Sequence, residues 1–202
     1  DGGLERRLAA EPLLRPRARY GYFPAQAQGD ALAVLDPSDP SRTLVHIPFP
    51  RQAAGRHLSI PDFFRADRDV VALQLVTLGQ EAVDHAAKLY AEHGYAAYFA
   101  FHGLATELTE AYAEALHARV RRELGVQGKD LAVPALFAQG YQGSRYAFGY
   151  PACPDLAGNG LLLDLLDGAS IGVSLSEGHQ MTPEYTTSAL VAWHPQARYF
   201  SA

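Results

Sequence analysis

Short apolar runs separated by turn-forming residues dominate the first eighty positions of the chain. These runs are rich in β-branched and aromatic residues and predict strands over residues 19–23, 31–35, 43–47 and 70–78. Between the second and third run, residues 36–41 hold two Asp, two Pro and two Ser, which predicts a β-hairpin. Pro24 is expected to close the first strand, and residues 4–14 are expected to form a short helix.

The middle of the chain changes to a helical period. Over residues 104–124 the apolar positions recur every three to four residues, which predicts an amphipathic helix that ends at Gly125. A helix over residues 80–92 precedes it and stops before Gly94. A short helix over 161–166 and two strands over 170–174 and 188–193 follow. The prediction is an α+β fold: a single domain over residues 1–202, with a twisted antiparallel sheet and a helical middle section.

Charge and cysteine content exclude several classes of function. The 202 residues carry 17 Lys and Arg against 22 Asp and Glu, a net charge of −5, which argues against nucleic acid and anionic membranes as partners. The single cysteine, Cys153, excludes an internal disulfide and a cysteine-based metal site. No run approaches the roughly 20 apolar residues of a membrane helix. We expect a cytoplasmic chain, and its charged start without Met suggests a piece of something longer.

The common catalytic motifs are missing from the sequence, which has no Rossmann glycine fingerprint, P-loop or nucleophile elbow. A metal site is a weak alternative. Glu114 and His117 have a spacing that di-iron bundles use, but a second such pair is absent. Glu177 and His179 flank a glycine and are more typical of loop hydrogen bonding. A metal-dependent enzyme that uses these four residues remains open, while Glu107 and Glu114 are expected in ion pairs along the helix.

Residues 145–154 carry the most distinctive chemistry. Arg145 lies among three aromatic residues, and Gly149 allows backbone to approach a ligand closely. An arginine can bind a carboxylate through two parallel hydrogen bonds, and aromatic faces stack on purines or cations. The segment therefore predicts a pocket for a small zwitterionic or nucleotide-like ligand. An aromatic loop packed on the core is the alternative.

The same segment reads R-x-x-x-G-Y-P-A-C-P, and with its surroundings it resembles the S-adenosylmethionine-binding activation domain of cobalamin-dependent methionine synthase. The resemblance extends over nearly the whole chain. It includes the Tyr-Gly-Tyr-Phe-Pro-Ala run at 20–25, the helix segment 110–121, Tyr-Gln-Gly at 141–143, His-Pro at 194–195 and Tyr-Phe at 199–200.

This resemblance implies a function. The domain presents S-adenosylmethionine to cobalamin held by a neighbouring domain of the same longer chain, and an electron-donor protein such as a flavodoxin assists. The activity is then that of a methyltransferase, reactivating methionine synthase, and zinc belongs to another module. The implied domain has no catalytic residue and no metal of its own. The implied ligand-binding residues are Glu110, Arg145, Ala147, Gly149, Tyr150, Tyr199 and Phe200, with Arg145 on the ligand carboxylate.

The chain departs from the family pattern at two positions. An ungapped match places Ser59 where the family has a ligand-binding aspartate, and Asp62 lies three residues later. We assign that role to Asp62. A second acidic residue, expected six places before the arginine, is Gln139 here. A free-standing reactivator or scaffold for another corrinoid protein is the main alternative function.

Overall fold

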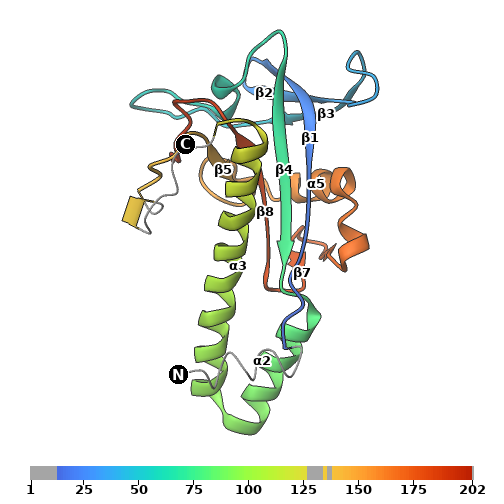
Figure 1. The fold of residues 1–202 in the computed structure, drawn as a ribbon, viewed down its shortest axis with the longest axis vertical. Helices are drawn as coiled ribbons and strands as arrows, with labels where there is room; N and C mark the ends of the chain where they lie inside the picture. Colours follow the sequence, from blue (N-terminus) through green and yellow to red (C-terminus); the bar gives the residue numbers. More distant parts are fainter. Residues whose placement is uncertain (1–12, 127–133, 136–137, 202) are drawn as a thin grey trace.

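A six-stranded antiparallel sheet forms the centre of the protein (Figure 1). The computed structural model describes residues 13–126, 134–135 and 138–201. The strands lie in the order β3-β2-β1-β4-β8-β5, and every neighbouring pair is antiparallel. Together with the helices this confirms the predicted α+β class. The strands are β1 (Arg17–Gln28), β2 (Ala31–Leu35), β3 (Thr43–Pro48), β4 (Asp69–Thr77), β5 (Ser144–Tyr146) and β8 (Thr186–Ala192).

The predicted hairpin is present, but the first strand is longer than expected. Asp36 and Asp39 each accept a backbone and a side-chain hydrogen bond from the serine two residues later, which closes the turn between β2 and β3. β1 does not end at Pro24 and continues to Gln28. In the described residues β2 pairs with β1 only from Ala25 onward, so up to Pro24 one side of β1 behaves as an edge. Pro24 has no backbone N–H to donate, and proline is tolerated at such an edge.

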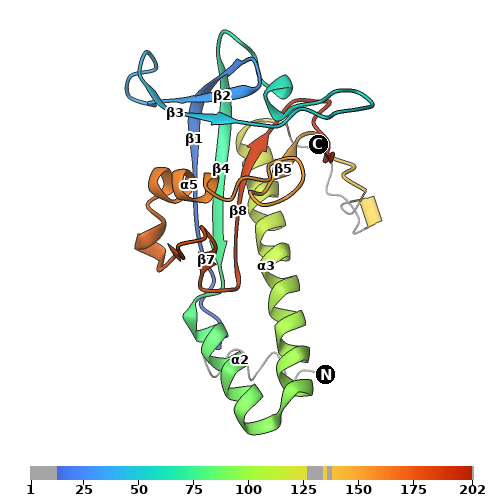
Figure 2. The same ribbon diagram turned by 180° about the vertical axis from the view of Figure 1, so that it is seen from behind.

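Alternate residues of β4 pack on opposite layers because successive side chains of a strand point to opposite faces. Val71, Leu73 and Leu75 join the main hydrophobic core with the short helices α5 (Gly158–Leu166) and η1 (Ile60–Phe63). Ala72 and Val76 instead pack against the long helix α3 (Tyr95–Glu123). The sheet therefore separates α3 on one face from α5 on the other, as Figures 1 and 2 show from the two sides.

The helical middle section is an antiparallel pair of helices. α2 (Gln80–His93) has the predicted position, and Gly94, at a φ of 79°, joins it directly to α3. α3 begins at Tyr95, nine residues before the predicted start. The pair extends beyond the end of the sheet, so the early part of α3 lacks the regular apolar stripe that marks its later part (Figure 1). No helix among the described residues has the length and apolar character needed to cross a membrane.

One late prediction needs correction, and one early prediction lies largely outside the described residues. The expected strand over 170–174 is a 3-10 turn, η2 (Gly168–Ile171), followed by a small hairpin of β6 (Ser174–Leu175) and β7 (Met181–Thr182). Ile171 at the end of this turn and Val173 just after it are both buried, so burial rather than strand structure explains their alternation. Gly172, at a φ of 80°, interrupts the extended conformation. Residues 4–12 of the helix expected over 4–14 are not among those described.

Candidate functional site

A cleft of about 760 Å³ lies between α3 and the strands β5 and β8, on the α3 face of the sheet. This volume is in the range of small-molecule sites. The lining residues come from α3, from β5 with the segments before and after it, from β8 and from the C-terminal segment. They are Glu107, Glu110, Ala111, Glu114, Ala115, Ala118, Gln139, Tyr141, Arg145, Ala147, Tyr150, Thr187, Ala189 and Tyr199.

One stripe of α3 forms a wall of the cleft. Its lining residues recur at intervals of three and four, so they lie on the same side of the helix. Three of the six are alanines, whose small side chains leave space between the helix and the sheet. The other three are glutamates, Glu107, Glu110 and Glu114. This wall therefore combines small apolar side chains with negative charge.

Arg145 enters the cleft from the edge strand β5. Its neighbour Tyr146 points to the opposite face and is buried in the main core, with its hydroxyl donating to the carbonyl of Arg198 at 2.8 Å. Arg145 therefore points toward α3. Its Nη2 lies 3.0 Å from Glu110, and its Nε lies 3.6 Å from Glu114. Nη1 has no polar partner within the described part of the chain, so the end of the guanidinium is available to a ligand anion.

Glu114 is the centre of a polar network behind Arg145. It accepts from Nη1 of Arg121 at 3.1 Å and from the Tyr141 hydroxyl at 3.3 Å. Burial raises the pKa of the Glu114 carboxyl, but the positive charges of Arg121 and Arg145 oppose this effect, and the pKa is lowered overall. The carboxylate is thus held ionised in a part-buried position.

Two tyrosines form the exposed rim of the cleft. Tyr150 is 54% exposed and Tyr199 is 45% exposed. Tyr150 is held in a tight turn, in which its carbonyl accepts from the Cys153 amide at 2.8 Å. The Tyr199 amide donates to the Gln139 side chain at 3.1 Å, and Gln139 also donates to Ser144 at 3.3 Å. This glutamine thereby ties the C-terminal segment to the start of β5.

The structure brings five of the eight sequence-predicted site residues to the cleft: Glu110, Arg145, Ala147, Tyr150 and Tyr199. Gly149, Phe200 and Asp62 are not among the lining residues. Gly149 lies between two that are, at a φ of 90°, where an added Cβ would stand 2.7 Å from Leu156. Phe200 is buried in the main core beside Phe63.

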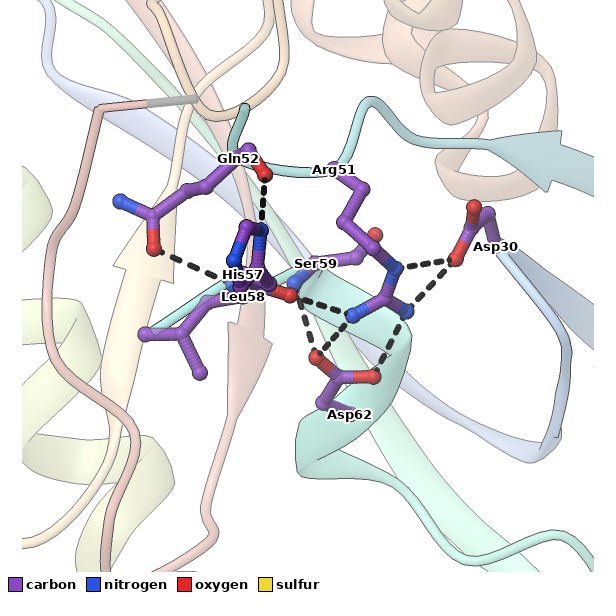
Figure 3. A network of polar contacts seen from close by, with 7 residues as sticks. All are labelled: Asp30, Arg51, Gln52, His57, Leu58, Ser59 and Asp62. Carbon is purple, nitrogen blue, oxygen red and sulfur yellow. Dashed lines mark hydrogen bonds and ion pairs between the residues drawn. The ribbon is translucent and has the colours of Figure 1, made fainter. Parts of the chain in front are cut away.

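Asp62 lies in a separate polar network, shown in Figure 3. Its two oxygens accept from Arg51 at 2.8 and 2.9 Å, and one of them also accepts from the Ser59 amide at 2.9 Å. Arg51 in turn binds Asp30 at the turn between β1 and β2. The hydrogen bond from Arg51 exceeds the opposing effect of burial and lowers the pKa of Asp62. These contacts do not test whether Asp62 also binds a ligand, so a ligand contact by Asp62 stays a prediction.

Comparison with known protein families identifies this architecture. The family model described as vitamin B12 dependent methionine synthase, activation domain, matches residues 3–202. The chain belongs to this family.

Longer relatives contain a segment similar to this activation domain. A methionine synthase of Mycobacterium tuberculosis is 44% identical over 96% of the chain, and one of Mycobacterium leprae is 40% identical over 90%. The chain spans only 18% and 16% of those two proteins. Among solved structures, a MetH reactivation domain bound to AdoHcy matches with a TM-score of 0.90 and 28% identity. That match covers 98% of this chain and 64% of the other.

The metal alternative finds no support in the fold of this activation domain. Glu114 and His117 lie on α3, whereas Glu177 and His179 lie between β6 and β7. Over residues 13–126, 134–135 and 138–201, no three His, Cys, Asp or Glu side chains are grouped closely enough to bind a metal ion. Nδ1 of His117 instead faces Nη1 of Arg121 at 2.8 Å.

Sequence reasoning missed several residues that the fold brings to the cleft. Glu107 and Glu114 were expected in ion pairs along the helix and not among the ligand-binding residues, yet both line the cleft. Their spacing from Glu110, by three and four residues, is a signal that places all three on one side of α3. Tyr141, Thr187 and Ala189 carry no comparable signal, because only the pairing of β5 with β8 brings them together.

Proposed function

We propose that this activation domain binds S-adenosylmethionine in the cleft between α3 and β5. The proposal rests on the end of the Arg145 guanidinium. Nε and one N–H of Nη2 face glutamates, so Nη1 and the second N–H of Nη2 are left to donate two parallel hydrogen bonds to the ligand carboxylate. The related MetH reactivation domain bound to AdoHcy supports a ligand of this type.

The charge of the cleft suits the remainder of that ligand. S-adenosylmethionine has a sulfonium and an ammonium group as well as its carboxylate, so it carries a net positive charge. Glu107, Glu110 and Glu114 line the wall opposite the sheet and complement it. Tyr150 and Tyr199 offer aromatic faces at the rim, where a cation is stabilised without a counter-ion.

We further propose that residues 1–202 act as the activation domain of a longer methionine synthase, a methyltransferase of the cytoplasm. The similar segments of the mycobacterial proteins lie within much longer chains, which supports this function over a free-standing reactivator. Cobalamin, bound by a neighbouring domain, supplies the metal centre that accepts the methyl group. An electron-donor protein such as a flavodoxin is the second partner, and zinc belongs to another module.

Presenting a methyl group requires little chemistry from this chain. Transfer from a sulfonium needs alignment of the sulfur–methyl bond and exclusion of water, but no general acid or base. Arg145 fixes one end of the ligand, and the tyrosines at the rim lie where the methyl group would leave the cleft. Cys153 is buried and takes no part.

Calorimetric titration of the 202-residue chain tests the binding proposal. S-adenosylmethionine and S-adenosylhomocysteine are expected to bind saturably at one site. Adenosine, which lacks the amino-acid moiety that Arg145 recognises, serves as a matched control and is expected to bind much more weakly. Equal affinity for adenosine would remove Arg145 from the proposed site, and absence of binding by all three compounds would overturn the proposal.

A further inference from the structure

Arg121 is a buried cation that lies behind the cleft and does not line it. Its side chain is 9% exposed, and its guanidinium lies 3.8 Å from the centre of the Tyr141 ring. Nη1 faces Oε1 of Glu114 at 3.1 Å and Nδ1 of His117 at 2.8 Å. An arginine nitrogen can only donate, so the fully buried His117 accepts at Nδ1 and carries its own proton on Nε2. These contacts fix Arg121 on three sides.

Glu114 connects this buried cation to the cleft. Its Oε1 faces Arg121, while its Oε2 lies 3.6 Å from Nε of Arg145. The two arginines are thus bridged by one carboxylate. We infer that Arg121 is a positioning residue for Arg145, holding Glu114 so that the Arg145 guanidinium keeps its free end directed into the cleft. This inference rests on the proposed binding of S-adenosylmethionine by Arg145.

The balance of charge explains why a second arginine is needed. Two glutamates, Glu110 and Glu114, face Arg145, and Glu114 is only 24% exposed. A part-buried carboxylate without a close partner is costly. With Arg121 in place, Glu114 keeps a close ion pair even when Arg145 shares its charge with a ligand carboxylate.

A purely electrostatic role for Arg121 and a positioning role predict opposite effects. Removing a positive charge makes the cleft more negative, so charge alone would strengthen the binding of a ligand with a net positive charge. Positioning predicts the reverse, because Glu114 and then Arg145 lose their defined orientation. The sign of the change in affinity therefore distinguishes the two roles.

The experiment compares three variants by calorimetric titration with S-adenosylmethionine. Arg121→Met keeps the volume and removes the charge, and we expect affinity to fall about tenfold, the effect of one lost charge-assisted hydrogen bond. Arg121→Lys keeps the charge and is expected to recover part of the loss, since one ammonium cannot replace the planar fork. Arg119→Met is the matched control. Arg119 lies two residues before Arg121 on α3 and forms an exposed ion pair with Glu123. Its loss should leave the affinity for S-adenosylmethionine unchanged.

A pH series adds a measurement that a general loss of stability would not change. The groups in contact with Glu114 are His117 and Arg121 from α3, with Tyr141 and Arg145 from the segment through β5. Glu110 on α3 is the second carboxylate that contacts Arg145. Without Arg121, burial is opposed by fewer favourable charges, so Glu114 should take up a proton at higher pH than in the wild type. In Arg121→Met, affinity should fall further between about pH 7 and pH 5, whereas the wild type stays nearly constant.

A measurement without ligand separates this inference from the proposed function. In nitrogen-15 NMR spectra of the free protein, the Nε–H of Arg145 should exchange slowly with water in the wild type and in Arg119→Met, and faster in Arg121→Met. Unchanged exchange in a folded Arg121→Met protein would overturn the inference, as would unchanged or tighter ligand binding. If the wild type fails to bind S-adenosylmethionine, the proposed function falls, and the exchange result still decides whether Arg121 positions Arg145.

Discussion

Arg145 on β5 and Glu110 on α3 form an ion pair of 3.0 Å that connects the edge of the sheet to the long helix. The two residues are 35 positions apart in the chain. The pair uses Nη2 of the arginine, and Glu114 approaches Nε on the same side of the guanidinium. One side of Arg145 is therefore held by the protein, and its end faces the cleft.

Replacing Arg145 should weaken ligand binding without unfolding the protein. Arg145→Ala removes a two-point contact to a carboxylate worth about 1.5–3 kcal/mol, so affinity for S-adenosylmethionine should fall roughly tenfold to hundredfold. Arg145→Lys should recover only part of the loss because an ammonium lacks the planar fork. Arg42→Ala, an exposed arginine near the β2–β3 hairpin, is the control in the same titration. Unchanged binding by Arg145→Ala would exclude Arg145 from the site.

The ion pair between Arg51 and Asp62 should make stability depend on pH. The Arg51 hydrogen bond lowers the pKa of Asp62 below its ordinary value of 3.8, so the unfolded chain binds this proton more tightly than the folded protein. The ion pair therefore stabilises the fold at pH values above the ordinary pKa of 3.8. This stabilisation is lost as the pH falls through the lower pKa that Asp62 has in the folded protein. Asp62→Asn should lower Tm at neutral pH, and the difference from the wild type should shrink toward about pH 3.

Asp164→Asn is the control for this prediction, because Asp164 is exposed on α5. It should change Tm little at either pH. The same Asp62→Asn protein also tests the sequence-based assignment of Asp62 to the ligand. A marked loss of affinity for S-adenosylmethionine in the folded variant at neutral pH would support that assignment, and unchanged affinity would leave Asp62 with a structural role alone.

Cys153 should be chemically inert in the folded protein. Its side chain is 3% exposed, and burial together with the charge of Asp155 raises the pKa of the thiol to about 12. Roughly one thiol in ten thousand is then ionised at pH 8. Iodoacetamide should modify Cys153 slowly in the native protein and rapidly in denaturant, as mass spectrometry would show. Fast modification of the native protein would contradict this burial.

Substitution of Cys153 should affect stability more than ligand binding. Cys153→Ser places a hydroxyl in the main core, where an unpaired polar group costs about 1–3 kcal/mol. Cys153→Ala is the matched variant without that hydroxyl. Both should bind S-adenosylmethionine almost as the wild type does, and a loss of binding in either folded variant would reopen a chemical role for the thiol.

The parts of the fold that local chemistry determines were predictable from sequence. Asp36 and Asp39 close the β2–β3 turn with hydrogen bonds to residues two positions away, so the hairpin was identified correctly. β5 was not predicted, because a strand of three residues exists only through its pairing with β8. The strand expected over 170–174 was wrong for a related reason. Its alternating apolar residues are buried by the packing of a turn rather than by a sheet.

In the candidate site too, contacts between residues close in the sequence were predictable, whereas contacts made by tertiary packing were not. Residues 145–154 are contiguous, so the sequence alone brought Arg145, Ala147 and Tyr150 into one region. The connection from Arg121 through Glu114 to Arg145 depends on how α3 packs against β5, and no local pattern indicates it. The assignment of Asp62 to the ligand, from its position relative to the Phe pair, stays a prediction. The contact of Arg51 with both its oxygens is another interaction that only the fold reveals.

The exposed tyrosines at the rim of the cleft give the last prediction, which concerns the longer enzyme proposed above. An exposed aromatic side chain gains little from burial in this domain, so Tyr150 and Tyr199 are available to contact another surface. Presentation of the ligand to cobalamin requires that surface to come over the cleft. Tyr150→Ala and Tyr199→Ala should therefore impair recovery from the oxidised, inactive cofactor more than they impair methionine formation in the primary cycle.

Two assays on the full-length enzyme measure this difference: methionine formation during turnover, and return of activity after oxidation, under reducing conditions with S-adenosylmethionine. Tyr95→Ala is the matched control. Tyr95 is 64% exposed but begins α3 at the end far from the cleft, so its loss should leave both rates unchanged (Figure 1). S-adenosylmethionine shifts the arrangement of domains only through its greater affinity for the one in which the cleft covers cobalamin. Weakening that arrangement slows reactivation alone, whereas equal losses in both assays would assign these tyrosines to general stability.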